Sequence, residues 1–146
     1  ELELVQAGGR FSPEQREKLA SAGVSSRVLQ FESLGRKELA PYYRAAKLVL
    51  LPSTAEGFGL PVIESLACGT PVVASDIPVL RQVGGDGVVL CPVDALAAWK
   101  AAVSKVLDGG GPGREACLRV ASAYTWAAHA KTILGTYAAL ADGGAS

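Results

Sequence analysis

Short apolar runs alternate with longer amphipathic stretches along most of the chain. Four of the apolar runs have the length of a strand and are nearly continuous, at residues 28–31, 47–51, 71–75 and 88–91. Such runs are typical of strands that are buried on both faces of a parallel sheet. Residues 2–7 add a first strand. With helical stretches between them, these strands predict an α/β protein with a doubly wound, Rossmann-like parallel sheet.

The first helix is marked at both ends. Ser12 and Gln15 have the spacing of a capping box, and Pro13 between them suits the first helical position. Gly23 provides the left-handed residue at which a helix commonly stops. We therefore expect a short helix between the strands at residues 2–7 and 28–31.

The later helices are less uniformly marked. Residues 38–46 have helical character, but Pro41 predicts a late or kinked start. Asp94 is the expected N-cap of a long helix that reaches Leu107, and Thr125 is the expected N-cap of the last helix. Beyond that helix, residues 142–146 are expected to be a disordered tail, which leaves residues 1–141 as one domain.

Composition narrows the possible functions. A chain of 146 residues with 49% hydrophobic residues can form one domain with a buried core. Lys plus Arg equals Asp plus Glu, at 14 each, so no basic field would attract nucleic acid or anionic lipid. No apolar run is long enough to cross a membrane, since Glu64 interrupts the longest. We predict no nucleic-acid partner and no transmembrane segment.

The three cysteines are Cys68, Cys91 and Cys117. They are scattered and lack paired C-x-x-C spacing, which favours reduced core residues over a disulfide framework or a metal site. No cluster of spaced metal ligands occurs elsewhere, so we expect no metal, no cofactor and a metal-independent reaction. Reduced cysteines indicate a cytoplasmic protein.

The richest chemistry lies in the segment EGFGLPVIE at residues 56–64, directly after the strand at residues 47–51. Gly57 and Gly59 allow a tight turn close to a ligand, and Pro61 suits the first turn of a helix. A strand, a glycine turn and a helix start form an anion site, because free N–H groups and the helix dipole point outward. The flanking carboxylates are suited to accept hydrogen bonds from hydroxyls. Phosphate and hydroxyls together indicate a nucleotide sugar.

Glu64 is the only charged residue between Glu56 and Asp76, in a helix that is otherwise largely apolar. Such a helix is normally buried, and a buried carboxylate needs partners. The spacing from Leu60 to Glu64 is i to i+4, which directs the carboxylate toward the glycine loop. The alternatives are a surface glutamate or a carboxylate that caps the N–H groups of the loop.

These residues resemble a known family. The segments at residues 48–53, 56–64 and 67–76 are similar to those of the group 1 (family 4) retaining glycosyltransferases. Members of that family have the two-domain GT-B fold, and nearly the whole chain resembles their donor-binding C-terminal domain. Two glutamates separated by seven residues, with Gly-Phe-Gly-Leu-Pro between them, make the resemblance specific.

The resemblance implies a role for each site residue. Glu56 would be the catalytic residue that contacts the sugar ring of the donor, and Glu64 would hold the hydroxyls of the ribose. Ser33 and Leu34 lie in the loop that would seat the nucleotide base. The residues whose backbone N–H groups would contact the sugar and the diphosphate are Gly57, Phe58, Gly59 and Leu60.

The chain also departs from the family. It begins at Glu1 within the family's second C-domain strand, so it lacks the first strand and the following loop, which provides an Arg and a Lys for the diphosphate. The N-terminal domain with the acceptor site is also absent. We therefore expect an inactive fragment whose partners are the nucleotide-sugar donor and the missing domain of a longer parent. The open sheet edge favours self-association. The parent would be cytoplasmic, including a peripheral position at the cytosolic face of a membrane.

Three other functions compete with this one. A dinucleotide-dependent oxidoreductase is disfavoured, because the G-x-G-x-x-G pattern fails at Val62. A nucleotide-sugar epimerase or hydrolase of similar fold remains an alternative, although it needs acid–base groups for which Glu56 is the one candidate. A catalytically silent domain kept for assembly or regulation also remains open.

Overall fold

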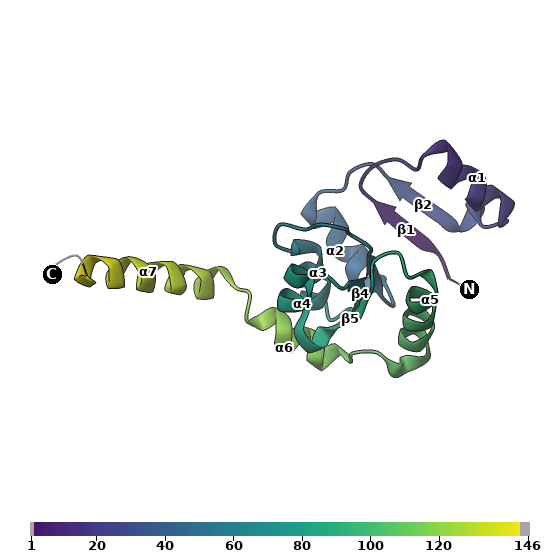
Figure 1. Cartoon of the computed structure of the whole chain (residues 1–146). Helices are drawn as coiled ribbons and strands as arrows, with labels where there is room; N and C mark the ends of the chain where they lie inside the picture. The colour runs from purple at the N-terminus through teal and green to yellow at the C-terminus, as the bar shows by residue number, and fades with distance from the viewer. Residues whose placement is uncertain (1, 144–146) are drawn as a thin grey trace. The chain divides into compact units, whose positions relative to one another are not determined.

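The computed structural model describes residues 2–143 and divides into two compact units (Figure 1). The first unit ends at Tyr42 and the second begins at Tyr43. Each contains a parallel sheet, which confirms the predicted α/β class. Hydrogen bonds join β1 to β2, and β3 to β4 to β5, so the described strands form two sheets instead of one.

The first unit is a strand–helix–strand arrangement. Its elements are β1 (Leu4–Ala7), α1 (Pro13–Ser21), the 3₁₀ turn η1 (Ser25–Arg27) and β2 (Val28–Phe31). The strands pair in parallel with Leu4 opposite Val28 and Ala7 opposite Phe31. No described residue of this unit is buried. The unit therefore has the predicted local structure without a core of its own.

The capping box of α1 is present as predicted. The backbone N–H of Gln15 donates to Ser12 Oγ at 3.2 Å, and the backbone N–H of Ser12 donates to Gln15 Oε1 at 2.8 Å. Pro13 occupies the first turn, and Gly23 follows the helix with a positive φ of 67°. Both predicted ends of this helix are confirmed.

Helix α2 (Arg36–Ala45) begins earlier than the sequence predicted and passes through Pro41 without ending. The backbone N–H of Gly35 donates to Glu38 Oε2 at 2.8 Å, and the N–H groups of Glu38 and Leu39 both donate to the Gly35 carbonyl. These bonds establish the first turn before the proline. The missing N–H of Pro41 therefore removes one bond from a helix that has already begun.

The second unit holds the rest of the chain. Its elements are β3 (Val49–Leu51), α3 (Leu60–Ala67), β4 (Val72–Ser75), α4 (Pro78–Gly84), η2 (Gly85–Gly87), β5 (Val88–Cys91), α5 (Leu96–Lys105), the π turn η3 (Val106–Gly110), α6 (Arg114–Ser122) and α7 (Trp126–Gly143). The strand order is β3-β4-β5, all parallel. Each strand was predicted at this position, to within one or two residues.

Of the two N-caps predicted for α5 and α7, the first is wrong and the second is confirmed. Asp94 is not the N-cap of α5, because it has a left-handed backbone (φ 63°) and Ala95 occupies the cap position without a side-chain bond. Thr125 is confirmed as a cap, since its Oγ1 accepts from the backbone N–H of Ala128 at 3.1 Å. Helix α7 runs to Gly143, two residues into the predicted tail, and residues 144–146 lie outside the described residues.

The core of the second unit has one part on each face of its sheet. On one face, side chains of α3, α4 and α6 pack against Val72 and Ala74 of β4. On the other face, Ala102 and Val106 pack against Val73. Alternate residues of a strand point to opposite faces, so β4 contributes to both parts.

The cysteines are free thiols, as predicted. Cys91 and Cys117 are buried, and burial raises the pKa of both thiols. Cys68 is half-buried. Within residues 2–143, no helix combines the length and the apolar character that a membrane span requires.

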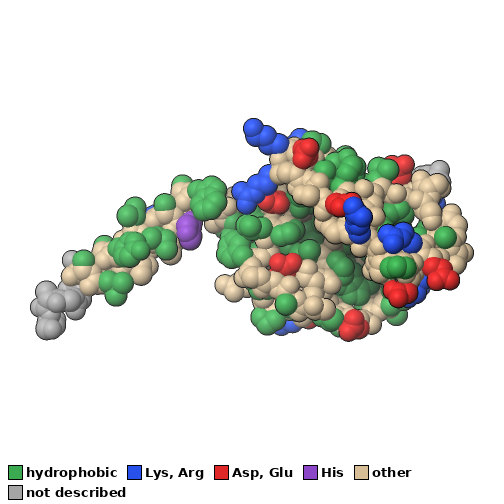
Figure 2. Space-filling view, turned by 90° about the horizontal axis from the view of Figure 1, so that it is seen from above, with side chains coloured by type: hydrophobic (Ala, Val, Ile, Leu, Met, Phe, Trp, Pro, Cys, Tyr) green, Lys and Arg blue, Asp and Glu red, His purple; other side chains and the backbone are tan. Residues whose placement is uncertain are grey.

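Helix α7 differs from the other helices of the second unit. Every residue from Trp126 to Ala141 is exposed, and hydrophobic side chains are visible along the helix in Figure 2. The large hydrophobic residues that are exposed on this helix include Ile133, Tyr137 and Leu140. Charged side chains of both signs are scattered over the rest of the face that Figure 2 shows, in agreement with the balanced composition.

Candidate functional site

The predicted turn from strand to helix is present after β3. Gly59 is the N-cap of α3, with a left-handed backbone (φ 80°), and Pro61 lies in the first helical turn. Gly59 is buried, and a Cβ at this position would lie 2.9 Å from Cδ2 of Leu80. Both the backbone conformation and the contact with α4 therefore require glycine here.

The N-terminus of α3 is open to an anion. Among the described residues, no side chain caps this end of the helix. The N–H groups of Val62 and Ile63 donate back to the Gly59 carbonyl. Pro61 has no N–H, so the N–H of Leu60 is the one that this turn leaves for a ligand. Together with the positive end of the helix dipole, it favours a negative group at this position.

Glu56 is half-buried at the beginning of the loop. The hydroxyl of Ser53 donates to Glu56 Oε1 at 2.7 Å. This bond orients the carboxylate and uses one of its acceptor positions, which leaves others for hydroxyl groups of a ligand. Ser53 stands three residues before Glu56 in the sequence, but its hydrogen bond to that carboxylate was not predicted.

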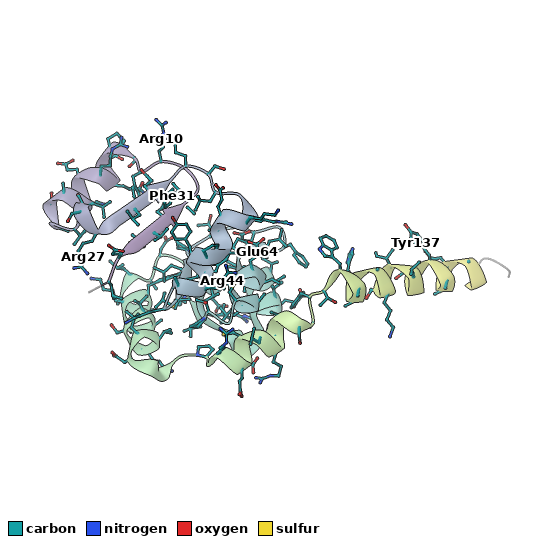
Figure 3. The ribbon with its side chains drawn as sticks, turned by 180° about the vertical axis from the view of Figure 1, so that it is seen from behind. Arg10, Arg27, Phe31, Arg44, Glu64 and Tyr137 are labelled. Atoms are coloured by element: carbon teal, nitrogen blue, oxygen red, sulfur yellow. The ribbon has the colours of Figure 1, made fainter. Side chains whose placement is uncertain are left out.

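Glu64 projects from α3 and is half-buried (Figure 3). The phenol of Tyr43, on α2, forms a hydrogen bond with its carboxylate. Burial, the Glu64 charge, the Cys68 thiol and this hydrogen bond together raise the pKa of Tyr43 to about 12. Glu64 therefore has the partner that a carboxylate on a largely apolar helix needs. The sequence did not identify it, because 20 residues separate Tyr43 from Glu64.

Tyr43 is held in place by a hydrogen bond that its backbone carbonyl accepts. The hydroxyl of Thr70 donates to the Tyr43 carbonyl at 2.6 Å, and the hydroxyl of Ser65 donates to the Thr70 carbonyl at 3.0 Å. Ser65, Thr70 and Tyr43 are all buried. These bonds fix the end of α2 against the turn between α3 and β4. They therefore restrain the position of the Tyr43 phenol beside Glu64.

The loop between the glutamates is mostly exposed. Phe58 and Leu60 have 52% and 46% of their surface exposed, although both are apolar. The ring of Phe58 makes an edge contact with Tyr124, with centroids 6.3 Å apart, and the Tyr124 hydroxyl donates to the Gln82 carbonyl at 3.3 Å. Tyr124 thus supports the loop from the junction of α6 and α7, a role that the sequence did not indicate.

The predicted site residues fall in both units. Glu56, Gly57, Phe58, Gly59, Leu60 and Glu64 come together at the loop and at α3. Ser33, which is exposed, and Leu34, which is half-buried, follow β2 in the first unit. The second unit by itself therefore contains the glutamates and the loop, and the first unit contains the candidate base-binding residues.

Residues 1–109 match the profile of the family described as glycosyl transferases group 1. The chain belongs to this family. A curated relative is D-inositol 3-phosphate glycosyltransferase from Mycolicibacterium smegmatis, which is 38% identical over 138 residues. The match covers 88% of this chain and 31% of that relative. This group 1 chain thus spans about one third of the length of the curated relatives that it matches.

Solved structures agree with this assignment. Sucrose-phosphate synthase from Thermosynechococcus elongatus has a TM-score of 0.78 and 28% identity, over 97% of this chain and 39% of the synthase chain. HepE from Anabaena, solved with UDP, has a TM-score of 0.68 and 18% identity, over 83% of this chain and 35% of its own. The second likeness concerns the fold alone. The fold is that of part of a GT-B glycosyltransferase.

Proposed function

We propose that this chain is the donor-binding part of a longer glycosyltransferase, which moves a sugar from a nucleoside diphosphate to an acceptor with retention of configuration. The observation that carries the proposal is the uncapped N-terminus of α3 between two oriented carboxylates. An anion at the helix start and hydroxyls at both sides are the features of a nucleotide sugar. The name of the M. smegmatis relative and the UDP bound to HepE point to the same chemistry.

The leaving nucleoside diphosphate gains negative charge as its bond to the sugar breaks. The dipole of α3 and the N–H groups of the loop stabilise that charge without reorganising, which is the main demand of the reaction. Gly57, Phe58, Gly59 and Leu60 act through their backbone N–H groups. This role is compatible with the exposed side chains of Phe58 and Leu60.

The carboxylates have distinct roles in this proposal. Glu56, oriented by Ser53, contacts the sugar and stabilises the positive charge that develops on its ring. Glu64 accepts hydrogen bonds from the ribose hydroxyls. A carboxylate has about four acceptor positions, which suits it to bind hydroxyls as well as the phenol of Tyr43. Ser33 and Leu34 would contact the base.

The test uses the complete protein that carries this sequence. Glu56→Gln should lower kcat far more than it weakens donor binding, because its interaction grows as the ring becomes positive. Glu64→Ala should weaken donor binding by about 1.5–3 kcal/mol, or roughly ten- to more than a hundredfold in Kd. Product analysis in the same assay distinguishes transfer from epimerisation or hydrolysis.

Two further variants make this test specific. Tyr43→Phe removes the bond between the phenol and Glu64 but keeps the carboxylate, so it should retain most of the donor affinity. Glu115→Gln changes an exposed carboxylate on α6 and should change nothing. Normal kinetics in both the Glu56 and the Glu64 variants would show that the assigned site is wrong.

We also propose that residues 1–146 alone bind donor weakly and transfer no sugar, since the chain spans about 31% of the M. smegmatis relative. Calorimetry with several nucleoside diphosphates measures the binding, and a transfer assay with the same chain measures the activity. Sugar transfer by the 146-residue chain would contradict this part of the proposal.

A further inference from the structure

An exposed ion pair lies at the carboxyl end of β4, apart from the glutamates and their loop. The guanidinium of Arg81 donates twice to Asp76 Oδ1, from Nε at 3.0 Å and from Nη2 at 2.5 Å. Asp76 follows the last residue of β4, and Arg81 lies within α4, so its side chain bends back toward the end of the strand. The Asp76 side chain is 31% exposed and that of Arg81 is 66% exposed. The pair is oriented by its own bonds and is open to a ligand.

The strand register places this pair at the same edge of the sheet as Glu56. Leu51 and Ala74 are paired residues near the ends of β3 and β4. Ser53 and Asp76 each follow two residues later, at the edge where the carboxyl ends of parallel strands meet and where ligands of such sheets bind. The hydroxyl of Ser53 donates to Glu56. Two carboxylates therefore lie beyond the ends of two neighbouring strands.

A side-chain contact brings α4 against the loop between the glutamates. A Cβ at Gly59 would lie 2.9 Å from Leu80 Cδ2 and 3.9 Å from Val83 Cγ1. Leu80 directly precedes Arg81 in the helix. This contact and the strand register are independent observations, and both place the ion pair beside the candidate site.

The pair offers hydrogen-bond acceptors and donors side by side. Both of its bonds end on Oδ1, and among the residues that the structure describes none forms a hydrogen bond to Asp76 Oδ2 or from Arg81 Nη1. A carboxylate oxygen accepts and a guanidinium N–H donates, whereas a hydroxyl does both. Two adjacent hydroxyls can therefore bind together, one to the carboxylate and one to the guanidinium.

The charges of the pair disfavour an anion. Asp76 neutralises Arg81, and its carboxylate repels a phosphate that approaches the guanidinium. The start of α3, which no described side chain caps, is the better position for a diphosphate. The uncharged hydroxyls of a sugar suit the pair instead.

We propose that Asp76 and Arg81 are specificity-determining residues that bind adjacent hydroxyls of the transferred sugar. The inference rests on the proposed function, because it requires a donor whose diphosphate lies at the start of α3. Glu56 contacts the sugar from the end of β3, and the pair contacts it from the end of β4. The pair therefore discriminates among sugars that lack a hydroxyl or carry it in another configuration, since the unsuitable sugar leaves a charged group unpaired.

The contact is tested with Arg81→Gln and Asp76→Asn in the complete protein. Equilibrium binding is measured for UDP-glucose, GDP-mannose and ADP-glucose, each compared with its free nucleoside diphosphate. Both variants should weaken binding of the sugar nucleotide by about tenfold or more, because a hydroxyl loses a charged partner. Binding of the free nucleoside diphosphate should not change.

The chain offers a matched control for charge and exposure. Arg119 forms a similar exposed ion pair with Asp86. Asp86 precedes β5, so this second pair lies at the amino end of a strand, at the opposite edge of the sheet. Arg119→Gln should leave the binding of every ligand unchanged, and an effect equal to that of Arg81→Gln would show that only the overall charge matters.

Deoxy donors distinguish a direct contact from a structural role. For the nucleotide sugar that the unaltered protein binds best, a series of analogues lacks one sugar hydroxyl at a time. The analogue without the contacted hydroxyl should bind to the unaltered protein and to Arg81→Gln within about twofold, because the two changes remove the same interaction. A structural role would weaken the binding of all analogues alike.

Three outcomes would overturn the proposal. Equal weakening of the sugar nucleotide and the free diphosphate would show that the pair only shapes the loop. Unchanged binding in both variants, beside impaired Glu56 and Glu64 variants, would show an ion pair that touches no ligand. An effect confined to the KM of the acceptor would assign the pair to hydroxyls of the acceptor. Failure of the unaltered protein to bind any nucleotide sugar would contradict the proposed function itself.

Discussion

The two faces of the three-stranded sheet are covered to different extents. On one face, α3, α4 and α6 bury Val62 and Leu66 completely, together with Leu80. On the other face, α5 covers Val73 but leaves Leu50 partly exposed beside a groove. Both faces belong to the same strands and have similar apolar residues. The difference therefore lies in the elements that are available to cover them.

This comparison explains why Leu50 is partly exposed although it is apolar. A parallel sheet is made of strands that are apolar on both faces, so each face requires a layer of helices. Leu50 has the character of a core residue in a place where that layer is incomplete. The candidate site lies at the helix layer that covers the other face completely, because Gly59 and α3 pack against α4.

The largest effect is expected from truncating one leucine on each face. Leu66→Ala, on the covered face, should lower the free energy of unfolding by about 2–5 kcal/mol, because it leaves a cavity in a close-packed core. Leu50→Ala should cost about 1 kcal/mol or less, since its side chain already contacts solvent. Urea unfolding of the 146-residue chain measures both. Equal losses would show that the faces are equally packed in solution.

The next effect concerns the loop that leads into the covered face. Gly59→Ala should destabilise the chain by about 1–3 kcal/mol, because alanine is strained at a positive φ and its Cβ would press on Leu80. Gly57→Ala is the matched control, since a Cβ there has no neighbour within 4 Å. Its stability should be nearly unchanged. A stable Gly59→Ala variant would mean that α4 does not restrain the loop.

A smaller effect is expected at Tyr43, where α2 meets α3. Tyr43→Phe removes the hydrogen bond to Glu64 and should lower the free energy of unfolding by about 1–2 kcal/mol at neutral pH. Thermal or urea unfolding measures this loss. An unchanged stability would show that water replaces the phenol as the partner of Glu64.

The same residue predicts a pH dependence. The folded chain holds the phenol proton up to about pH 12, whereas an unfolded tyrosine releases it near pH 10. The unfolded state therefore binds fewer protons in this window, and the free energy of unfolding falls as the pH rises from about 10 to 12. The Tyr43→Phe variant should lack this part of the decline. Parallel pH profiles of the two proteins would contradict the raised pKa.

The smallest effect is expected beside the groove. The indole N–H of Trp99 donates to the Pro92 carbonyl at 3.0 Å, and Trp99→Phe removes this bond. Because the bond is neutral and partly open to solvent, the loss should be about 0.5–1 kcal/mol in urea unfolding. A loss as large as that of Leu66→Ala would show that the groove side is as tightly packed as the covered side.

Much of the fold could be predicted because its signals are local. The capping box at Ser12 and Gln15, the hydroxyl cap at Thr125 and the glycine turn before α3 each depend on residues a few positions apart. Asp94 shows the limit of such signals. Its residue type suits a cap, but its left-handed backbone places the cap at the next residue.

The candidate site was predicted in part for the same reason. The two glutamates and the loop are contiguous, so their relation follows from the turn and the helix. The partners of the glutamates are harder to predict from the sequence. Ser53 is three residues from Glu56, but Tyr43 belongs to a different helix from Glu64. Tyr124, which supports Phe58, is more distant still. No spacing rule connects residues whose proximity depends on how helices pack.

The sequence by itself determined the order of strands and helices, the glycine turn, and the placement of both carboxylates around a helix start. These depend on backbone preferences and periodicity, which act over a few residues. Only the tertiary structure decided that Tyr43 holds Glu64, that Leu80 requires glycine at position 59, and that one sheet face is left bare at Leu50. Each of these depends on surfaces from distant segments, whose contact is set by the packing of the whole unit.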